Sequence, residues 1–339
     1  MRRHLSMLVF FLIVLLLSGC TGGKKFEMPE IQKNDFEQAS KSLDEYISGK
    51  MKSQKVIGFS IAVVSGDKVI FMKGYGYADK ENKIPVTEKT LFRMGSISKL
   101  FTATSVMQLE EQGKIDIDNP LNTYIKEFSI KTRYENSDPI TPRNIMTHHS
   151  GLPSDRLKDM MAMSPISFEN LVIELQNEYT AFPPNMIFSY SNLAISLLGR
   201  LVEVVSQEDF ISYTDKNLFK KMEMDNSGFK LNSDMEKLYA KGYINGEPVK
   251  QYLTYAVPAG LLYSNAEDMS KFIITILNKG SYKDNSVIKP ETLEKMWRKQ
   301  NEGIELDLGY EMGLGWFFDR SMEEYAGLIY MHDGAWDDF

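Results

Sequence analysis

Two kinds of periodicity alternate along the chain and predict both strands and helices. Residues 57–64 and 69–77 are rich in β-branched and aromatic side chains, and the polar segment 65–68 between them has the composition of a tight turn. These stretches therefore predict an antiparallel hairpin. Apolar and aromatic residues also gather near the end of the chain, at 314–318 and 328–332, and predict two further strands.

Helical periodicity fills the chain between these strands. Apolar residues recur at three- or four-residue spacing in six segments, which we expect to be helices. These segments are 35–51, 98–112, 167–178, 193–206, 209–222 and 264–277. Strands at both ends with helices between them predict an α+β fold, in which the two ends assemble one antiparallel sheet. Residues from about 115 to 255 would form an inserted helical lobe, and a cleft between lobes is a usual place for a site.

The first twenty residues have the pattern of an export signal. Arg2 and Arg3 precede an apolar run over 5–17, which is shorter than the ~20 residues of a membrane-spanning helix. The run ends in Leu17-Ser18-Gly19-Cys20, which resembles the lipobox of bacterial lipoproteins. The resemblance implies that Cys20 is lipidated and anchors the exported chain to the outer face of the cell membrane. An uncleaved membrane anchor is the alternative, and it also places the rest of the chain outside the cytoplasm.

Composition narrows the possible classes of function. Cys20 is the only cysteine among 339 residues, so the exported part has no disulfide and no thiolate metal site. Residues 21–34 have little periodicity and would form a flexible linker, and 35–339 are long enough for a folded domain. The formal net charge is −7, and removal of the two positive charges of Arg2 and Arg3 leaves −9. This negative charge argues against nucleic-acid binding.

A candidate nucleophile precedes the helix predicted over 98–112. On a helical turn, Ser96 and Lys99 lie on one face, close enough for the amine to reach the hydroxyl. Serine needs such a base, and free N–H groups at a helix start favour the charge of an oxyanion. The same spacing recurs in surroundings typical of turns at Ser65/Lys68, Ser227/Lys230 and Ser286/Lys289. Only Ser96 is followed by a long apolar-periodic run.

Two more polar motifs could complete a site. Tyr190-Ser191-Asn192 precedes the helix predicted from 193, where a phenol could carry a proton and an amide could orient a substrate carbonyl. The Tyr-x-Asn spacing also occurs at 134/136, 243/245 and 263/265. His332-Asp333-Gly334-Ala335 ends the last predicted strand and could present a cation beside backbone N–H groups. A purely structural histidine is the alternative at this position.

The adjacent pair His148-His149 invites a metal-site interpretation, because histidine is a common ligand. Neighbouring histidines rarely point at one ion, and His332 is the only other histidine after the export signal. We therefore expect this pair to fix a loop, and we expect no metal.

Taken together, the three motifs resemble the serine β-lactamase and penicillin-binding protein superfamily, whose signatures are Ser-x-x-Lys, Tyr-x-Asn or Ser-x-Asn, and Lys-Thr-Gly or His-x-Gly. The Tyr-x-Asn form is similar to the branch of class C β-lactamases, D-alanyl-D-alanine carboxypeptidases and esterases. Four further stretches resemble this branch in sequence and order, at 74–79, 85–103, 145–153 and 258–269. The resemblance covers about residues 36–339 and implies a β-lactamase/transpeptidase-like fold.

The resemblance also implies a reaction. The protein would be a serine hydrolase that acts through a covalent acyl-enzyme and needs no metal or organic cofactor. Ser96 would be the acylated nucleophile and Lys99 its proton partner. Tyr190 would be the general base, which also activates the deacylating water.

By the same resemblance, four residues would bind the acyl substrate. Asn192 would contact the substrate amide, and His332 and Gly334 would occupy the third motif. The N–H groups of Ser96 and Ala335 would form the oxyanion hole. The substrate would be a β-lactam, a D-amino-acid peptide or a small ester, and the oligomeric state stays open.

Two departures from the family pattern bear on this expectation. His332 replaces lysine and Asp333 replaces a hydroxyl residue, so the positive charge at neutral pH would be only partial and a carboxylate would lie beside it. This weakens binding of substrate carboxylates and favours esters, D-amino-acid peptides or an unknown acyl substrate. The sequence also stops at Phe339, where the family has further strands and a terminal helix, so we expect a fragment rather than an open sheet edge. A non-catalytic binding or sensor lipoprotein and a truncated, poorly folded product are the alternatives.

Overall fold

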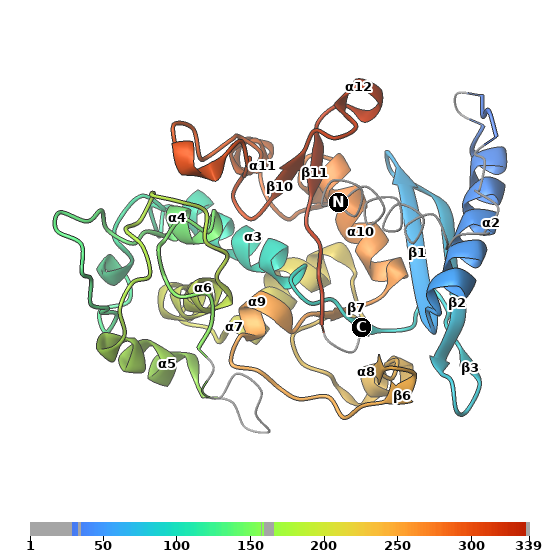
Figure 1. The fold of residues 1–339 in the computed structure, drawn as a ribbon, viewed down its shortest axis with the longest axis horizontal. Helices are drawn as coiled ribbons and strands as arrows, with labels where there is room; N and C mark the ends of the chain where they lie inside the picture. The colour runs from blue at the N-terminus through green and yellow to red at the C-terminus, as the bar shows by residue number, and fades with distance from the viewer. Residues whose placement is uncertain (1–28, 33–34, 157, 159–165, 337–339) are drawn as a thin grey trace, which may run out of the picture. The chain divides into compact units, whose positions relative to one another are not determined.

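The structure is a computed structural model, shown in Figure 1, and it describes residues 29–32, 35–156, 158 and 166–336. The predicted export signal and its lipidation site Cys20 lie outside these residues. The chain forms two compact units, with the boundary between Lys55 and Val56. Among the described residues, no helix is long and apolar enough to cross a membrane.

In the first unit, the described residues contain one long helix, α2 (Phe36–Gln54). It begins after Asp35, whose carboxylate accepts a hydrogen bond of 3.0 Å from the backbone N–H of Gln38. It ends at Lys55, which takes the left-handed conformation typical of a helix end. The helix predicted over 35–51 is therefore confirmed, and it extends three residues further.

The second unit opens with the predicted hairpin. Strands β1 (Gly58–Ser65) and β2 (Lys68–Asp79) pair antiparallel, with Gly66 in a left-handed turn between them. The two-residue strand β3 (Ile84–Pro85) extends the sheet at its β2 edge. Helix α10 (Ala266–Leu277) packs against β1 and β2, and it begins after Asn265, which accepts a hydrogen bond from the Asp268 backbone.

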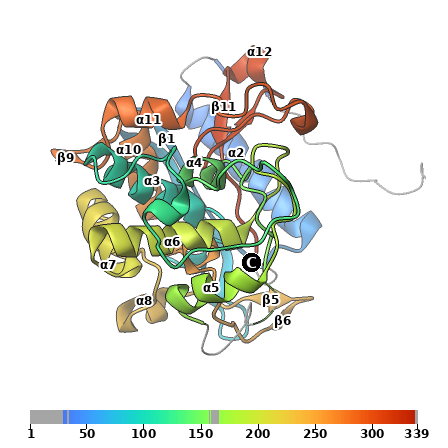
Figure 2. The same ribbon diagram turned by 90° about the vertical axis from the view of Figure 1, so that its left-hand side faces the viewer.

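The centre of the second unit is helix α3 (Ser98–Glu111), in which residues 98 to 109 are all buried. Helix α6 (Asn192–Ser206) packs against α3, and both contact the short helix α9 (Val257–Gly260). Figure 2 shows α6 beside α5 (Phe168–Glu174) and α7 (Phe210–Thr214), which also pack against it. Helix α3 also contacts α7, and these neighbouring helices explain why twelve consecutive residues of α3 are buried.

Two predicted helices change their winding partway. The segment predicted over 167–178 is α5 followed by a 3₁₀ turn at Leu175–Asn177. The segment predicted over 209–222 is α7 followed by a π turn (Asp215–Phe219) and a 3₁₀ turn (Lys220–Met222). Apolar spacing near 3.6 residues predicts a helical segment but does not distinguish these tighter or wider turns.

The strands predicted near the chain end are confirmed as β10 (Phe317–Asp319) and β11 (Ile329–Met331), which pair antiparallel. The expectation that both chain ends assemble one sheet is wrong for the described residues, where β10–β11 and β1–β3 are separate sheets. In Figure 1, α10 is drawn between them. Periodicity predicts an extended segment, whereas tertiary contacts choose its pairing partner.

The other elements are short. A two-residue ladder joins β4 (Phe92–Arg93) to β7 (Tyr263–Ser264) and proves important for the site. Among the described residues, the remaining α-helices are α4 (Pro142–Met146), α8 (Ser233–Leu238), α11 (Pro290–Met296) and α12 (Glu323–Ala326). The remaining strands are β5 (Tyr243–Ile244), β6 (Glu247–Pro248), β8 (Ser281–Tyr282) and β9 (Asn285–Ser286). The fold class is α+β, as the sequence predicts, with a helix-rich segment at about 115–255.

Candidate active site

Ser96 lies in a tight turn between β4 and α3. The turn is fixed on both sides, because the backbone N–H of Met94 donates to the Leu262 carbonyl at 2.8 Å and Gly95 takes a left-handed conformation with φ of 53°. The hydroxyl of Ser98 donates to the Gly95 carbonyl at 2.6 Å and accepts from the Leu262 N–H at 2.9 Å. These bonds hold the Ser96 turn against the segment that joins α9 to β7.

The structure brings Ser96, Lys99 and Tyr190 together. The Lys99 Nζ lies 2.9 Å from the Ser96 Oγ, as the predicted helical turn requires. The Tyr190 hydroxyl lies 2.6 Å from the same oxygen, although the two residues are 94 positions apart in the sequence. Lys99 Nζ also lies 4.7 Å from the centroid of the Tyr190 ring. One hydroxyl is therefore in contact with two groups that can move protons.

Lys99 is almost completely buried and has three hydrogen-bond acceptors. Its Nζ donates to Ser96 Oγ, to Asn192 Oδ1 at 2.8 Å and to the Ala259 carbonyl at 2.7 Å. Burial lowers the pKa of Lys99 from 10.5 to about 7, although the negative charges of Asp155 and Asp333 oppose this change. Near neutral pH the amine is therefore part neutral and part charged.

Tyr190 comes from the loop that precedes α6. Ser191 caps that helix by accepting from the Ala194 N–H at 2.9 Å, and the Tyr190 ring packs against His148 with 4.3 Å between ring centroids. Burial raises the pKa of Tyr190 to about 12, against the hydrogen bond to Ser96, which lowers it. The phenol is thus protonated at neutral pH. The duplicate Tyr263 lies elsewhere, where its hydroxyl accepts from Arg93 at 3.2 Å.

Asn192 begins α6, and both polar atoms of its amide are engaged inside the protein. Its Oδ1 accepts from Lys99, and its Nδ2 donates to Asp155 Oδ2 at 3.2 Å. If Asn192 contacts a substrate amide, as predicted, that hydrogen bond must either replace those to Lys99 and Asp155 or form in addition to them.

The third motif follows β11 and crosses the Ser96 turn at very short range. A Cβ atom at Gly95 would lie 2.8 Å from the Ala335 nitrogen, and one at Gly334 would lie 2.1 Å from the Met94 carbonyl oxygen. Only glycine fits at both positions, so the Ala335 backbone lies directly beside the residue that precedes Ser96.

His332 has little positive charge in this environment. Burial lowers the pKa of His332 to about 4, while its hydrogen bond to the Asp333 backbone opposes the change. The ring packs edge-on against Phe317, with 5.0 Å between centroids, and its Nδ1 lies 2.6 Å from the Asp333 carbonyl oxygen. His332 is thus a neutral imidazole at neutral pH rather than the partial cation that the sequence predicts.

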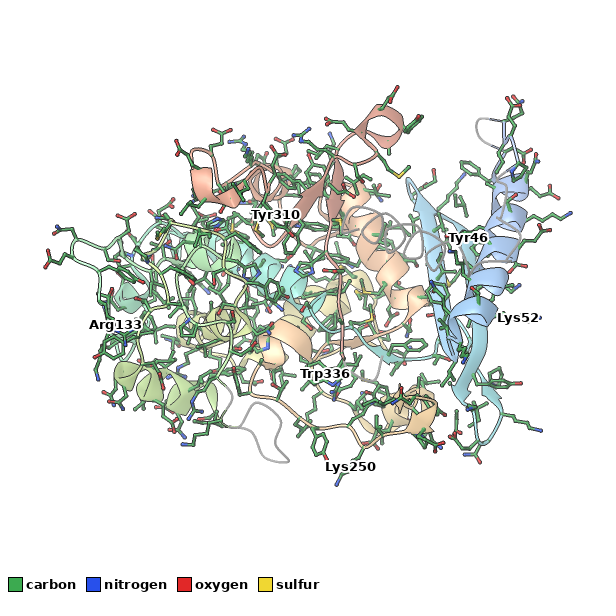
Figure 3. All side chains as sticks on the ribbon, in the orientation of Figure 1. Tyr46, Lys52, Arg133, Lys250, Tyr310 and Trp336 are labelled. Carbon is green, nitrogen blue, oxygen red and sulfur yellow. The ribbon has the colours of Figure 1, made fainter. Side chains whose placement is uncertain are left out.

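Aromatic residues surround this side of the site. Phe317 lies 5.9 Å from Tyr310 and 6.2 Å from Phe188 between ring centroids. Tyr310 is labelled in Figure 3. At the far end of the third motif, the Arg93 guanidinium lies 4.5 Å from the centroid of the Trp336 ring, also labelled there.

His148 and His149 fix loops, as the sequence predicts. His148 Nδ1 accepts from the Ser191 N–H at 3.2 Å, and His149 Nε2 lies 2.8 Å from the buried Asp307 carboxylate. In the part of the chain that the structure describes, histidine, cysteine, aspartate and glutamate do not gather in any group of three that could hold a metal ion.

Sequence reasoning missed two groups of the site, Asp155 and the Ala259 carbonyl. Asp155 follows the family-like stretch 145–153, and Ala259 lies within the family-like stretch 258–269. Neither residue belongs to a sequence motif that predicts a catalytic role. The position of a backbone carbonyl cannot be predicted from residue type, and Asp155 is recognised as part of the site only by its hydrogen bond to Asn192.

Comparison with known proteins places these residues in a wider context. A family model described as Beta-lactamase matches residues 43–338. Beta-lactamase-like protein 2 from Dictyostelium discoideum is 31% identical over 290 residues, which cover 81% of this chain and 53% of that protein. The chain therefore spans about half the length of this relative.

Two solved structures share the fold. The octameric penicillin-binding protein homologue from Pyrococcus abyssi superimposes with a TM-score of 0.72 at 27% identity, covering 87% of this chain and 68% of that one. A beta-lactamase/D-alanine carboxypeptidase from Pseudomonas syringae gives a TM-score of 0.71 at 24% identity, covering 84% and 76%. The second likeness concerns the fold alone.

Proposed function

The chain belongs to the beta-lactamase family, and from this premise we propose that it is an exported serine hydrolase that forms an acyl-enzyme at Ser96. One observation carries the proposal: the Ser96 hydroxyl lies within hydrogen-bonding distance of both Lys99 and Tyr190. An activated serine needs a base on one side and a proton donor for the leaving group on another. This arrangement supplies both.

In the proposed reaction, the neutral Lys99 amine takes the proton from Ser96 as Oγ attacks the substrate carbonyl carbon. The resulting oxyanion is stabilised by the N–H groups of Ser96 and Ala335. Tyr190 then donates its proton to the leaving group as the scissile bond breaks, and the ammonium of Lys99 restores that proton. In the second half of the reaction, water attacks the acyl-enzyme as the neutral Lys99 amine takes its proton. Tyr190 donates a proton to Ser96 Oγ as the acyl bond breaks, and Lys99 restores that proton.

This division of roles differs from the family-based expectation that Tyr190 is the general base. A base must be unprotonated, and a pKa of about 7 makes Lys99 that group, whereas a pKa of about 12 keeps Tyr190 protonated. Burial causes both shifts. In deacylation the same argument makes Tyr190 a proton donor beside the incoming water, rather than the base that the family resemblance implies.

We propose a neutral acyl substrate, an ester or an amide without a carboxylate near the scissile bond. His332 is neutral at neutral pH, and Asp333 places a carboxylate next to it where a substrate carboxylate would need a cation. Small esters fit this charge pattern best. D-amino-acid peptides and β-lactams carry a carboxylate and would bind more weakly.

We also propose that Cys20 is lipidated and anchors the protein to the outer face of a bacterial membrane. The motif Leu17-Ser18-Gly19-Cys20 supports this localisation. In cells, Cys20→Ser should move the protein from the membrane fraction to the soluble fraction; equal partition of both forms would contradict the anchor.

Mass spectrometry after incubation with a fluorophosphonate tests the hydrolase proposal. Wild-type protein should gain one label on Ser96, and Ser96→Ala should gain none. Ser65→Ala is the matched control, because Ser65 belongs to another Ser-x-x-Lys pair in the β1–β2 hairpin, and it should label like the wild type. If folded wild-type protein is never acylated by fluorophosphonates, esters or penicillins, the non-catalytic binding alternative replaces this proposal.

A further inference from the structure

Asp155 contacts the catalytic cluster although no motif assigns it a role. Its Oδ2 accepts the 3.2 Å hydrogen bond from Asn192 Nδ2, and its buried Oδ1 has no partner among the described residues within ordinary hydrogen-bond geometry. Burial raises the pKa of Asp155, and the Asn192 amide, the charge of Lys99 and the nearby Tyr255 hydroxyl oppose this change. A buried carboxylate oxygen without a partner is costly to keep. Its position next to the reacting groups therefore needs a reason.

The backbone on both sides of Asp155 is held in place. The Ser191 hydroxyl donates to the Pro153 carbonyl at 2.6 Å, and the Asn192 N–H donates to the Ser154 carbonyl at 2.8 Å. After Asp155, the next backbone N–H donates to the Tyr255 hydroxyl at 2.8 Å. Asp155 is thus fixed against the start of α6, where Asn192 lies.

The basic neighbour of Asp155 in sequence is engaged elsewhere. The Arg156 guanidinium pairs with Glu174 at the end of α5. The carboxylate of Asp155 therefore acts on the catalytic cluster, where its negative charge influences both Lys99 and Tyr190.

We propose that Asp155 is a positioning residue that orients the Asn192 amide and thereby holds Lys99 against Ser96. A carboxylate can only accept hydrogen bonds, so it requires the amide nitrogen of Asn192 to face it. The amide oxygen must then face the opposite way, toward Lys99, as observed. A flipped amide would place N–H groups against the ammonium and oxygen against the carboxylate. The inference rests on the proposed function, because it assigns Asp155 a role in that reaction.

Asp155 also adjusts the charge of Lys99. The negative charges of Asp155 and Asp333 favour the ammonium form of Lys99, and burial opposes it. Tyr190 also faces the amine, with its ring centroid 4.7 Å from Lys99 Nζ. On the other elements, His332 faces it after β11 and His148 lies behind Tyr190. Removal of the Asp155 charge should lower the pKa of Lys99, whereas a change in packing alone would leave that pKa unchanged.

Two substitutions separate orientation from charge. Asp155→Asn keeps an oxygen that can accept from Asn192 but removes the charge, so we expect the pH midpoint of Ser96 labelling to fall by about one unit. Asp155→Leu removes charge and acceptor, leaves Asn192 free to flip, and should slow labelling on the order of 100-fold. Asp138→Asn is the matched control, because Asp138 also accepts from an asparagine, Asn185, at 3.1 Å, but in an exposed loop.

A second measurement does not depend on turnover. NMR titration of the Lys99 side chain in the full chain should give a midpoint about one pH unit lower in Asp155→Asn than in the wild type. Equal midpoints, together with wild-type labelling rates in both variants, would overturn the positioning role. Loss of thermal stability with no change in the titration would also overturn it, since that pattern belongs to a packing residue. Absence of labelling in the wild type counts against the hydrolase proposal alone, because the titration still tests Asp155.

Discussion

At the scale of single residues, Lys99 combines two opposing demands. Its three acceptors, the oxygens of Ser96, Asn192 and Ala259, suit an ammonium group, yet the residue is only 1% exposed. Burial is the larger effect and lowers its pKa to about 7. The residue can therefore change its charge near neutral pH, which an exposed lysine cannot do.

The rate of Ser96 acylation should follow the neutral fraction of Lys99. Because the neutral amine is the proposed base, the rate should rise as the pH increases through about 7 and then level off. Lys99→Arg stays charged throughout this range and should lose roughly 10²–10⁴-fold in rate. Stopped-flow acylation with a chromogenic ester measures both effects. Lys68→Arg in the hairpin is the control, and a flat pH profile in the wild type would contradict Lys99 as the base.

At the scale of elements, the site depends on the close crossing of the third-motif segment over the turn between β4 and α3. Gly95 and Gly334 permit that crossing, since a Cβ at either position would overlap backbone atoms of the other segment. No hydrogen-bonded strand pairing holds the two segments together at this point in the described structure. The two segments can approach this closely because neither Gly95 nor Gly334 has a side chain.

Gly95→Ala should abolish acylation while the fold persists. Its Cβ would lie 2.7 Å from the Ala335 oxygen and push the third motif away from Ser96. Gly66→Ala is the matched control: Gly66 has a similar φ of 61°, but nothing lies within 4 Å of a Cβ there. Both changes should destabilise by the same ~1–2 kcal/mol of backbone strain, and only Gly95→Ala should stop labelling. Equal labelling of the two variants would show that the crossing is not needed.

At the scale of the whole molecule, a buried cluster joins the segment before β10 to the loop that carries Tyr190. Asp307 Oδ1 accepts from the Phe188 N–H at 2.7 Å, while Oδ2 contacts His149 Nε2 and Asn301 Nδ2. Burial opposes ionisation of Asp307, but these hydrogen bonds outweigh it and hold its pKa below the ordinary value. One carboxylate thus ties together three distant parts of the chain.

Asp307→Ala should lower the free energy of unfolding by at least about 2 kcal/mol, because three buried donors lose their acceptor. Urea denaturation at pH 7 measures this loss. Since the pKa of Asp307 is lowered on folding, its stabilising effect is complete above pH 3.8 and is lost as the pH falls below that value. The difference between the two proteins should therefore shrink in acid. Asp234→Ala, at a side chain that is 81% exposed, should change stability by no more than about 0.5 kcal/mol.

Local periodicity predicted the elements, and a helical turn predicted the contact of Lys99 with Ser96, whereas only the resemblance to the superfamily implied that Tyr190 joins them. Sequence reasoning did not indicate that the strands from the two chain ends form separate sheets, since pairing partners depend on tertiary contacts. It also missed Asp155 and the neutral state of His332. Burial determines both, and burial arises from residues that are distant in sequence.

The full burial of α3 links the nucleophile to the integrity of the core. Residues 98 to 109 are all buried, so loss of core packing around α3 also displaces the turn that carries Ser96 and its contact with Tyr190. In the wild-type chain, Ser96 therefore has its native surroundings only where the core is natively packed. A reagent that reacts with this serine therefore counts the correctly folded molecules in a sample, and it can report refolding yield without any knowledge of the natural substrate.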